Sequence, residues 1–168
     1  MNRSLTSIVL FLALTVACPS AVFASEFAMN VPLYGSAAYY VPARFGGVTS
    51  GELMVDTGSG YMSINEQTLA LLKQNGDAEY VKRVSGILAD GSQKTVPVYR
   101  LRTVSIGCCC VVRDVEAAVF PGTKRQILGL SALKTLAPFT ISTEPPQLTL
   151  SHCREDTSTR TAVGLSDF

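Results

Sequence analysis

The chain has 168 residues and a formal net charge of +1, and its length fits one domain of ordinary size. Its Lys and Arg residues are dispersed, and no basic stripe with interleaved aromatic residues occurs. The sequence therefore lacks the electrostatic pattern of a nucleic-acid-binding protein, and we expect no nucleic-acid partner.

Residues 1–24 have the pattern of a secretory signal peptide. A basic residue, Arg3, precedes an apolar stretch over residues 8–17, and Val22-Phe23-Ala24 offers a cleavage site before Ser25. The apolar stretch is shorter than the roughly 20 residues that a membrane-spanning helix needs, which weighs against a retained anchor. We therefore expect an exported protein, either periplasmic or secreted.

Cys18 leaves a second form of the exported product open. It follows Thr15-Val16-Ala17, a poor match to a lipobox because Leu is the usual first residue of that motif. Plain cleavage before Ser25 is the favoured prediction, and the protein would contact a membrane only if Cys18 were lipidated.

The region after the signal peptide is dominated by short strand-like runs separated by Gly, Pro, Asn and Asp. This spacing indicates an all-β sandwich or barrel. Between two of the runs, Asp90-Gly91 favours a tight hairpin turn. The expected strands cover residues 38–45, 51–55, 81–89, 94–101, 103–106, 111–119, 139–142 and 147–151.

Two short helices are expected among the strands, and neither is long enough to build a helical core. Asn65 is a good N-cap for a helix over residues 66–74 that ends at Asn75-Gly76. Ser131 is expected to cap a single turn that Pro138 stops. One folded domain should cover residues 25–153. Residues 154–168 are polar and lack apolar periodicity, so we expect a disordered tail there.

Four cysteines remain after the signal peptide: Cys108, Cys109, Cys110 and Cys153. Export permits disulfides, so one bridge from the triplet to Cys153 is expected. Metal binding is the alternative, but consecutive strand residues point to opposite faces and do not easily converge on one ion, and His152 adds little. We expect no metal and no cofactor.

Asp56 is the candidate catalytic residue. It ends the apolar run Leu53-Met54-Val55 and precedes Thr57-Gly58, so a strand would deliver its carboxylate to a fixed point. Two such carboxylates brought together cannot both ionise, and the pair can act as acid and base at once. Such a pair can activate a water molecule to split a peptide bond.

The segment over residues 53–64 resembles the active-site loop of the retropepsin-like aspartic proteases, in which apolar residues precede Asp-Thr-Gly, a small residue and a short strand. Residues 84–98 are similar to the flap hairpin that closes over substrate in that family. Ile127-Leu128-Gly129, followed by residues 130–133, is similar to the second signature, which packs beside the active-site loop and leads into a short helix. The resemblance covers about residues 36–151 and is closest to the single-domain exported bacterial members.

The resemblance implies an all-β, closed acid-protease barrel with one or two short helices and one lobe per chain. It implies that Asp56 is the catalytic acid or base, that Thr57 hydrogen-bonds across to its counterpart, and that Gly58 allows close approach. Val119 is a further candidate for lining side-chain pockets. The expected peptide-binding residues are Ser59, Ile87, Leu88, Ala89, Asp90 and Gly91.

Only one Asp-Thr-Gly is present in the chain, so the second carboxylate has to come from a second copy. We therefore expect a homodimer with Asp56 of both chains at the two-fold axis. Its substrate would be an extended peptide or an unfolded protein segment, bound by backbone hydrogen bonds with alternate side chains in pockets. Because the pair works with one proton, the expected pH optimum is mildly acidic.

Other functions remain as alternatives. A serine hydrolase would have to pair Ser59 with His152, the only histidine, and the segment lacks the Gly-x-Ser-x-Gly elbow. A retropepsin-shaped module that binds peptides without cutting them is the main rival, and an unrelated small β-barrel is the third possibility. The intact Asp56-Thr57-Gly58 favours the enzyme over the binding module, and oligomeric state together with the effect of losing Asp56 would discriminate the unrelated barrel.

Overall fold

The structure is a computed structural model, and it describes residues 26–88, 90–122 and 125–154. The expected signal peptide, the expected tail from residue 155 onward, and Ala89 of the expected flap lie outside the described residues. Among the described residues, no helix is long and apolar enough to cross a membrane.

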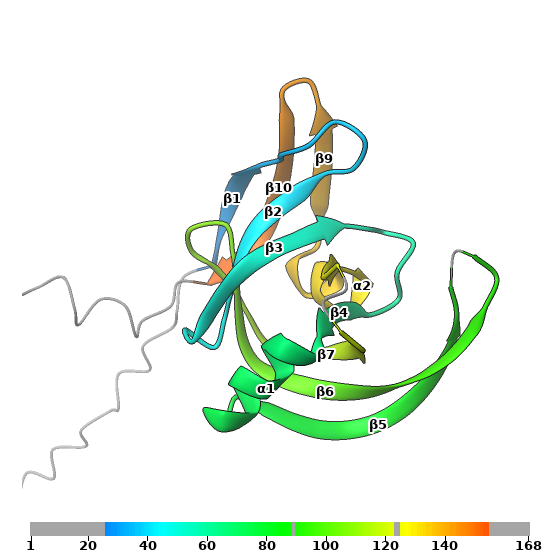
Figure 1. The fold of residues 1–168 in the computed structure, drawn as a ribbon. Coiled ribbons are helices and arrows are strands. Elements are labelled where there is room, and N and C mark those ends of the chain that lie inside the picture. The colour runs from blue at the N-terminus through cyan, green and yellow to red at the C-terminus, as the bar shows by residue number, and fades with distance from the viewer. Residues whose placement is uncertain (1–25, 89, 123–124, 155–168) are drawn as a thin grey trace, which may run out of the picture.

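Six strands close into a mixed barrel (Figure 1). The strand order is β2-β3-β8-β4-β7-β6, and the pairing of Ala43–Phe45 with Val104–Ile106 joins β2 to β6 and closes the ring. The β3–β8 and β4–β7 pairs are parallel, and the other pairs are antiparallel. The expected all-β closed barrel is confirmed. Its strands are β2 (Tyr40–Phe45), β3 (Thr49–Val55), β4 (Met62–Asn65), β6 (Gln93–Ile106), β7 (Cys110–Phe120) and β8 (Ile127–Leu128).

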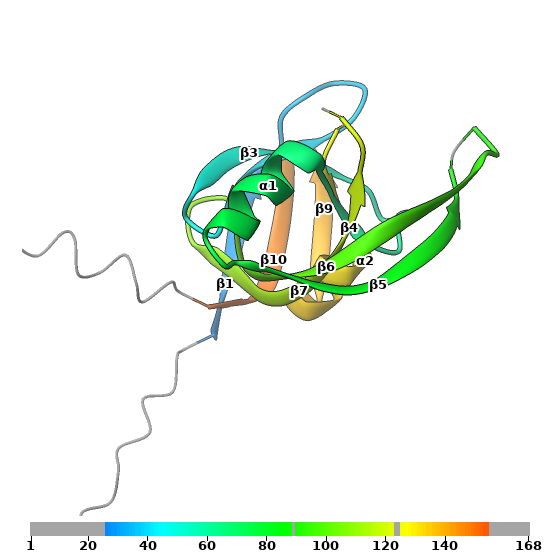
Figure 2. The same ribbon diagram turned by 60° about the horizontal axis from the view of Figure 1, so that its bottom comes forward.

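The strand β5 (Ala78–Ile87) pairs only with β6 and forms a long hairpin with it. The ends of β5 and β6 that meet at the hairpin turn reach beyond the barrel (Figure 2). We call residues 84–98 the flap hairpin. The expected strands 94–101 and 103–106 are one continuous strand, because β6 keeps pairing with β7 on both sides of Arg102.

A second sheet of three strands lies at one end of the barrel, in the order β1-β10-β9 (Figure 1). β9 (Phe139–Thr143) and β10 (Pro146–Arg154) extend the two terminal strands expected from the sequence. β1 (Glu26–Pro32) was not among the expected strands, and its alternating Phe27, Met29 and Val31 are more buried than their neighbours. That alternation is the signal from which it could have been found.

The helix α1 (Glu66–Gln74) has the expected bounds and the expected cap. Asn65 Oδ1 accepts a hydrogen bond from the backbone N–H of Thr68 at 2.9 Å. The expected Ser131 cap is wrong: α2 (Leu130–Leu133) has Gly129 as its N-cap, no side chain caps it, and a 3-10 turn (Lys134–Leu136) follows. The Ser131 hydroxyl is engaged elsewhere because it lies inside the helical turn and faces neighbouring strands.

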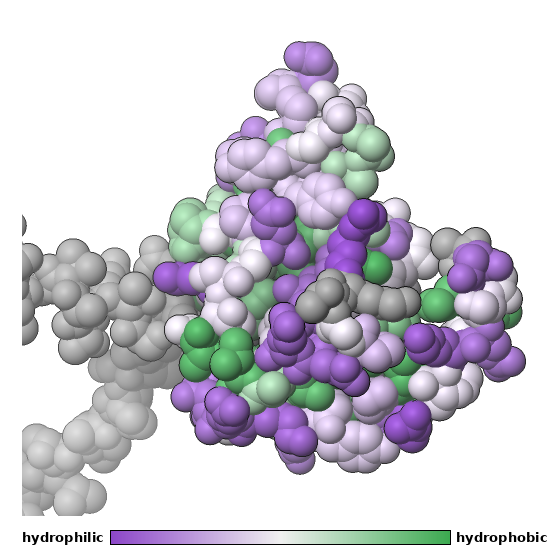
Figure 3. Space-filling model, viewed as in Figure 1, coloured by the Kyte–Doolittle hydropathy of each residue, from purple (hydrophilic) through white to green (hydrophobic). Residues whose placement is uncertain are grey.

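The barrel interior is filled by large apolar side chains with almost no exposure, among them Phe45, Leu53, Met62, Leu128 and Leu133. On the face seen in Figure 3 the coloured surface is mostly hydrophilic, and hydrophobic residues form small separate patches.

A disulfide ties the second sheet to the barrel. Cys110 at the start of β7 is bonded to Cys153 near the end of β10 at 2.04 Å, and both residues are fully buried. The expected bridge from the triplet to Cys153 is confirmed. It closes a loop of 43 residues, which in the chain-entropy account stabilises the fold by about 4 kcal/mol. A second disulfide joins Cys108 and Cys109.

Candidate active site

Asp56 lies directly after β3, where that strand leaves the barrel. Its backbone N–H donates to the carbonyl of Leu128 at 3.2 Å, and the preceding N–H of Val55 donates to Tyr39 at 2.9 Å. The strand end that carries the carboxylate is therefore hydrogen-bonded to a neighbouring segment on each side. Asp56 is partly exposed, and Thr57 and Gly58 after it are exposed.

The loop orients the Asp56 carboxylate through its own backbone. Asp56 Oδ1 accepts a hydrogen bond from the N–H of Gly58 at 2.9 Å, and the Asp56 carbonyl accepts one from Ser59 at 3.3 Å. A Cβ at Gly58 would lie 3.2 Å from Asp56 Oδ1, closer than most Cβ contacts. Because glycine has no side chain, the backbone N–H of residue 58 can approach the Asp56 carboxylate without a close contact from a Cβ atom.

The segment around Gly129 packs against the active-site loop, residues 56–61. A Cβ at Gly129 would lie 2.1 Å from the carbonyl oxygen of Tyr61, so only glycine fits there without movement of the backbone. The N–H of Leu130 donates to the carbonyl of Ser59 at 2.8 Å, and Ser59 Oγ donates to the carbonyl of Tyr61 at 2.7 Å. The loop and the start of α2 are thus one hydrogen-bonded unit.

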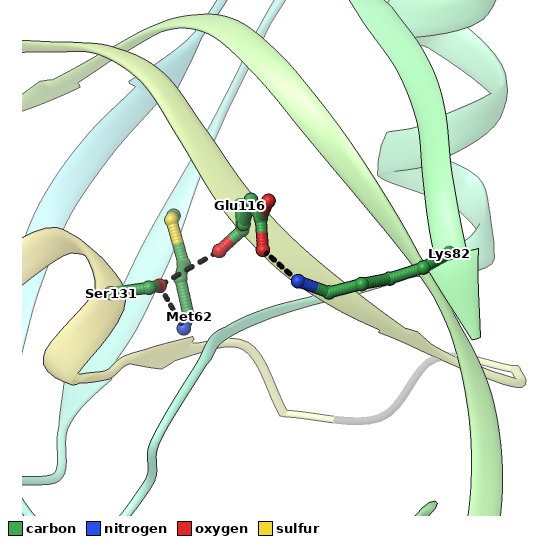
Figure 4. Close-up of polar contacts among 4 residues, drawn as sticks. All are labelled: Met62, Lys82, Glu116 and Ser131. Carbon is green, nitrogen blue, oxygen red and sulfur yellow. Dashed lines mark hydrogen bonds and ion pairs between the residues drawn. The ribbon is translucent and has the colours of Figure 1, made fainter. Parts of the chain in front are cut away.

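Ser131 extends this unit to two barrel strands (Figure 4). Its Oγ accepts from the N–H of Met62 on β4 and donates to the carbonyl of Glu116 on β7, both at 2.7 Å. The sequence predicted a helix cap for this hydroxyl, and no local pattern indicated its true partners, one of which is 69 positions away.

The same group of hydrogen-bonded residues also contacts β5, the strand that leads into the flap hairpin. Lys82 Nζ on β5 donates to Glu116 Oε2 at 2.8 Å and lies 5.6 Å from the centre of the Tyr61 ring. The hydrogen bond to Glu116, followed by the contact with Tyr61, raises the pKa of Lys82 above 10.5. One ammonium group therefore connects β5, β7 and the end of the active-site loop.

A pocket of about 190 Å³ lies between the active-site loop and the flap hairpin. It brings together three of the expected peptide-binding residues, Ser59, Ile87 and Leu88. Its lining is otherwise mainly apolar or small: Gly58, Gly60, Tyr61, Ser63, Val84, Gly86, Lys94, Val96, Ala118 and Phe120.

Val119 does not line this pocket, and its assignment to a substrate pocket is wrong. It is 3% exposed and belongs to the core, whereas Ala118 and Phe120 on either side of it line the pocket. Successive side chains on a strand point to opposite faces, so an error of one position exchanges core for pocket.

The tip of the flap hairpin is organised by its own turn. Asp90 Oδ1 accepts from the N–H of Ser92 at 2.9 Å and from its hydroxyl at 2.6 Å, and Gly91 has a φ of 80°. Ile87 at the end of β5 is 80% exposed. Asp90 and Gly91 extend past the pocket in the single chain, and their contact with a peptide stays a prediction.

The structure places Ser59 and His152 in different pockets. His152 lines a pocket of about 220 Å³ with Glu26, Leu136 and Arg154, on the side of the molecule that carries β10. The serine-hydrolase alternative therefore lacks a base beside its nucleophile. Within the described part of the chain, no group of three or more His, Cys, Asp or Glu is placed to hold a metal ion.

A closed mixed barrel that carries Asp-Thr-Gly at a strand end, next to an Ile-Leu-Gly turn and under a hairpin, defines the retropepsin-like class. Residues 41–132 match the family model described as aspartyl protease, and the chain belongs to this family. Among solved structures, the chain is similar to a retropepsin-like aspartic protease from Rickettsia conorii at 18% identity, with a TM-score of 0.55. That likeness covers 77% of this chain and 94% of the other, and it shows the fold. No curated protein matches the chain.

Proposed function

We propose that this chain is an exported aspartic endopeptidase that acts as a homodimer, with one Asp56 from each copy. The observation that carries the proposal is the placement of a single Asp-Thr-Gly at an exposed strand end. Backbone hydrogen bonds with Leu128 and Gly58 hold Asp56 in place, while Thr57 and Gly58 are exposed to solvent. A second copy placed over this surface would bring two Asp56 carboxylates together and give Thr57 its counterpart.

The paired carboxylates would hold one proton between them, because two adjacent negative charges repel. The ionised Asp56 would take a proton from water as its oxygen attacks the scissile carbonyl carbon. The neutral Asp56 of the other chain would donate its proton to the carbonyl oxygen. Proton transfer to the amide nitrogen then lets the C–N bond break, and no covalent intermediate with the protein forms.

The pocket between the active-site loop and the flap hairpin supports an extended peptide as substrate. Ser59, Ile87 and Leu88 line it, and most of its remaining lining is apolar or small, which suits an apolar substrate side chain. Closure of the hairpin would add Ala89, Asp90 and Gly91 as contacts along the peptide backbone. The export of this enzyme is part of the proposal and depends on the signal-peptide pattern of residues 1–24.

The test is cleavage of a mixed peptide library between pH 3 and 8 by the wild-type protein and by Asp56→Asn. Asp114→Asn is the matched control, because Asp114 is an exposed acid on β7 that does not line the pocket beside Asp56, and asparagine tolerates its φ of 53°. We expect activity at mildly acidic pH, retained in Asp114→Asn and abolished in Asp56→Asn. Cleavage by Asp56→Asn equal to wild type would contradict the proposal.

Mixing the proteins tests the dimer. If each site uses two chains, an excess of Asp56→Asn should lower wild-type activity by trapping wild-type chains in mixed dimers, beyond the effect of dilution. Activity unchanged by the excess would argue against a shared site. A folded wild-type protein that binds peptides but cleaves none across the pH range would instead support the binding module.

A further inference from the structure

A group of three sulfur atoms lies outside the candidate active site. The Sγ atoms of Cys108 and Cys109 are each 3.6 Å from Sδ of Met29, and the two cysteines are bonded to each other. We call Met29, Cys108 and Cys109 the sulfur cluster. Neither the Asp56 site nor the structural disulfide uses these atoms, because Cys110 is already bonded to Cys153.

The fold holds the sulfur cluster together from two distant parts of the chain. Met29 lies on β1, and the cysteine pair occupies the turn between β6 and β7. Gly107, with a φ of 64°, starts that turn, and a Cβ there would approach Val31 and Met29 at 3.1 and 3.2 Å. A glycine at this position therefore lets the turn lie directly against β1, with the thioether beside both cysteines.

The sulfur cluster is open to solvent on one side. Cys108 is exposed, Cys109 and Met29 are partly buried, and Cys108 borders a depression of about 310 Å³ together with Arg44 and Ser50. The Cys110–Cys153 bond, in contrast, is fully buried at both ends. A reductant in solution therefore reaches the Cys108–Cys109 bond before the structural one.

We propose that the sulfur cluster, once its cysteine pair is reduced, binds one Cu(I) ion through two thiolates and one thioether. Reduction by a dithiol breaks the Cys108–Cys109 bond. The dithiol supplies two electrons and two protons and closes to its own disulfide, leaving two thiols on the protein. Cu(I) binding then releases both thiol protons to solvent, and the copper keeps its oxidation state.

The ligand set selects the metal. Thiolate and thioether sulfurs favour Cu(I), whereas zinc sites call for four ligands of the Cys, His or carboxylate type. With metal–sulfur distances of about 2.3 Å, two sulfurs of a trigonal site lie about 4 Å apart. The separation of 3.6 Å between Met29 Sδ and each Sγ is close to that value, so only the two cysteine sulfurs need to move apart.

The test is a Cu(I) titration of the full chain against a chromogenic Cu(I) chelator, with and without prior reduction. The reduction is stopped when an alkylating agent reacts with two more thiols per chain than in the untreated protein, so that a thiol of Cys18 is counted in both samples. We expect one Cu(I) per reduced chain, none in the oxidised chain, and sulfur-only ligation by X-ray absorption. Met29→Leu, which keeps the side-chain size, should weaken Cu(I) binding by about tenfold or more. Substituting residues that only support the ligands of a metal already lowers its affinity by about that factor.

Met54→Leu is the matched control, because Met54 is a partly buried methionine on β3 whose sulfur contacts Arg125. It should bind Cu(I) as wild type does, and Cys108→Ser with Cys109→Ser should bind none while staying folded by circular dichroism. The proposal is wrong if reduced wild type binds no more Cu(I) than this double variant, or if Met29→Leu binds as tightly as Met54→Leu. Neither readout depends on peptide cleavage.

Discussion

The active-site loop and the flap hairpin face the same pocket, but they are held in different ways. The loop is bound by backbone hydrogen bonds to Leu128 and Leu130 and by the tight contact at Gly129. The hairpin beyond Gly86 is held mainly by its own strand pairing and turn, and a Cβ at Gly86 or Gly91 would meet no atom within 4 Å. The chain thus fixes its acid rigidly, and we expect the hairpin to open more readily than the loop.

The largest effect that separates the two regions is expected from Gly129→Ala. The new Cβ would lie 2.1 Å from a backbone oxygen of Tyr61, so the loop or the start of α2 has to shift. We expect the free energy of unfolding in urea to fall by about 3 kcal/mol. Gly60→Ala, in the same loop but with open space around it, should change stability by less than about 0.5 kcal/mol. Equal effects would remove the argument that the contact at Gly129 holds the loop.

Ser131→Ala should have the next largest effect. The substitution removes the hydroxyl that bridges the backbone of Met62 and Glu116, and it leaves two partly buried groups without this partner. We expect a loss of about 2 kcal/mol in urea unfolding. The control is Ser85→Ala on the hairpin, whose hydroxyl contacts that of Thr95 at an exposed position and should contribute less than about 0.5 kcal/mol. A control that costs as much as Ser131→Ala would mean that the hairpin is held as firmly as the loop.

Gly91→Ala tests the hairpin directly. The φ of 80° at Gly91 is unfavourable for residues with a Cβ, at a cost of about 1 kcal/mol. Because the hairpin is locally held, the cost should appear as about fivefold faster amide hydrogen exchange in residues 84–98, and the free energy of global unfolding in urea should fall by no more than about 1 kcal/mol. Gly86→Ala, at an open position without positive φ, should not speed exchange. Hairpin amides as strongly protected as those of the barrel core in the wild type would show that the hairpin unfolds together with the barrel.

The smallest effect is expected at Lys82, which joins the two regions. Its pKa is raised above 10.5 by the hydrogen bond to Glu116, so the contact stabilises the fold below pH 10.5 and is lost as the pH rises through the raised pKa. The fall in melting temperature between pH 8 and about pH 11.5 should therefore be slightly smaller in Lys82→Met than in wild type. An identical fall in Lys82→Met would refute a role for the contact in stability.

Features that depend on neighbouring residues were predictable from the sequence. The Asn65 cap, the Asp-Gly turn and the apolar run before Asp56 follow local rules of capping, turn formation and strand patterning. The family resemblance added the order of the barrel segments. These predictions correctly placed α1, the flap hairpin and the strand that carries Asp56.

Apart from the bridge from the cysteine triplet to Cys153, side-chain contacts between distant residues were not predictable. The Ser131 hydroxyl meets a partner 69 positions away, and Met29 meets Cys108 across 79 positions. The wrong assignment of Val119 has a similar origin, because the face of a strand residue depends on register with its neighbours. Short sequence patterns contain no information on which distant side chain fills a given space.

The pairing of β1 with β10 has a consequence for rearranging the gene. Glu26 and Arg154 are register partners, and their side chains form an ion pair at 2.7 Å, so the two ends of the described domain lie next to each other. A short linker can therefore join residue 154 to residue 26, and new termini can be opened at Asp90-Gly91. Such a circular permutant would keep every barrel strand intact while cutting the cover of the pocket into two free strand ends.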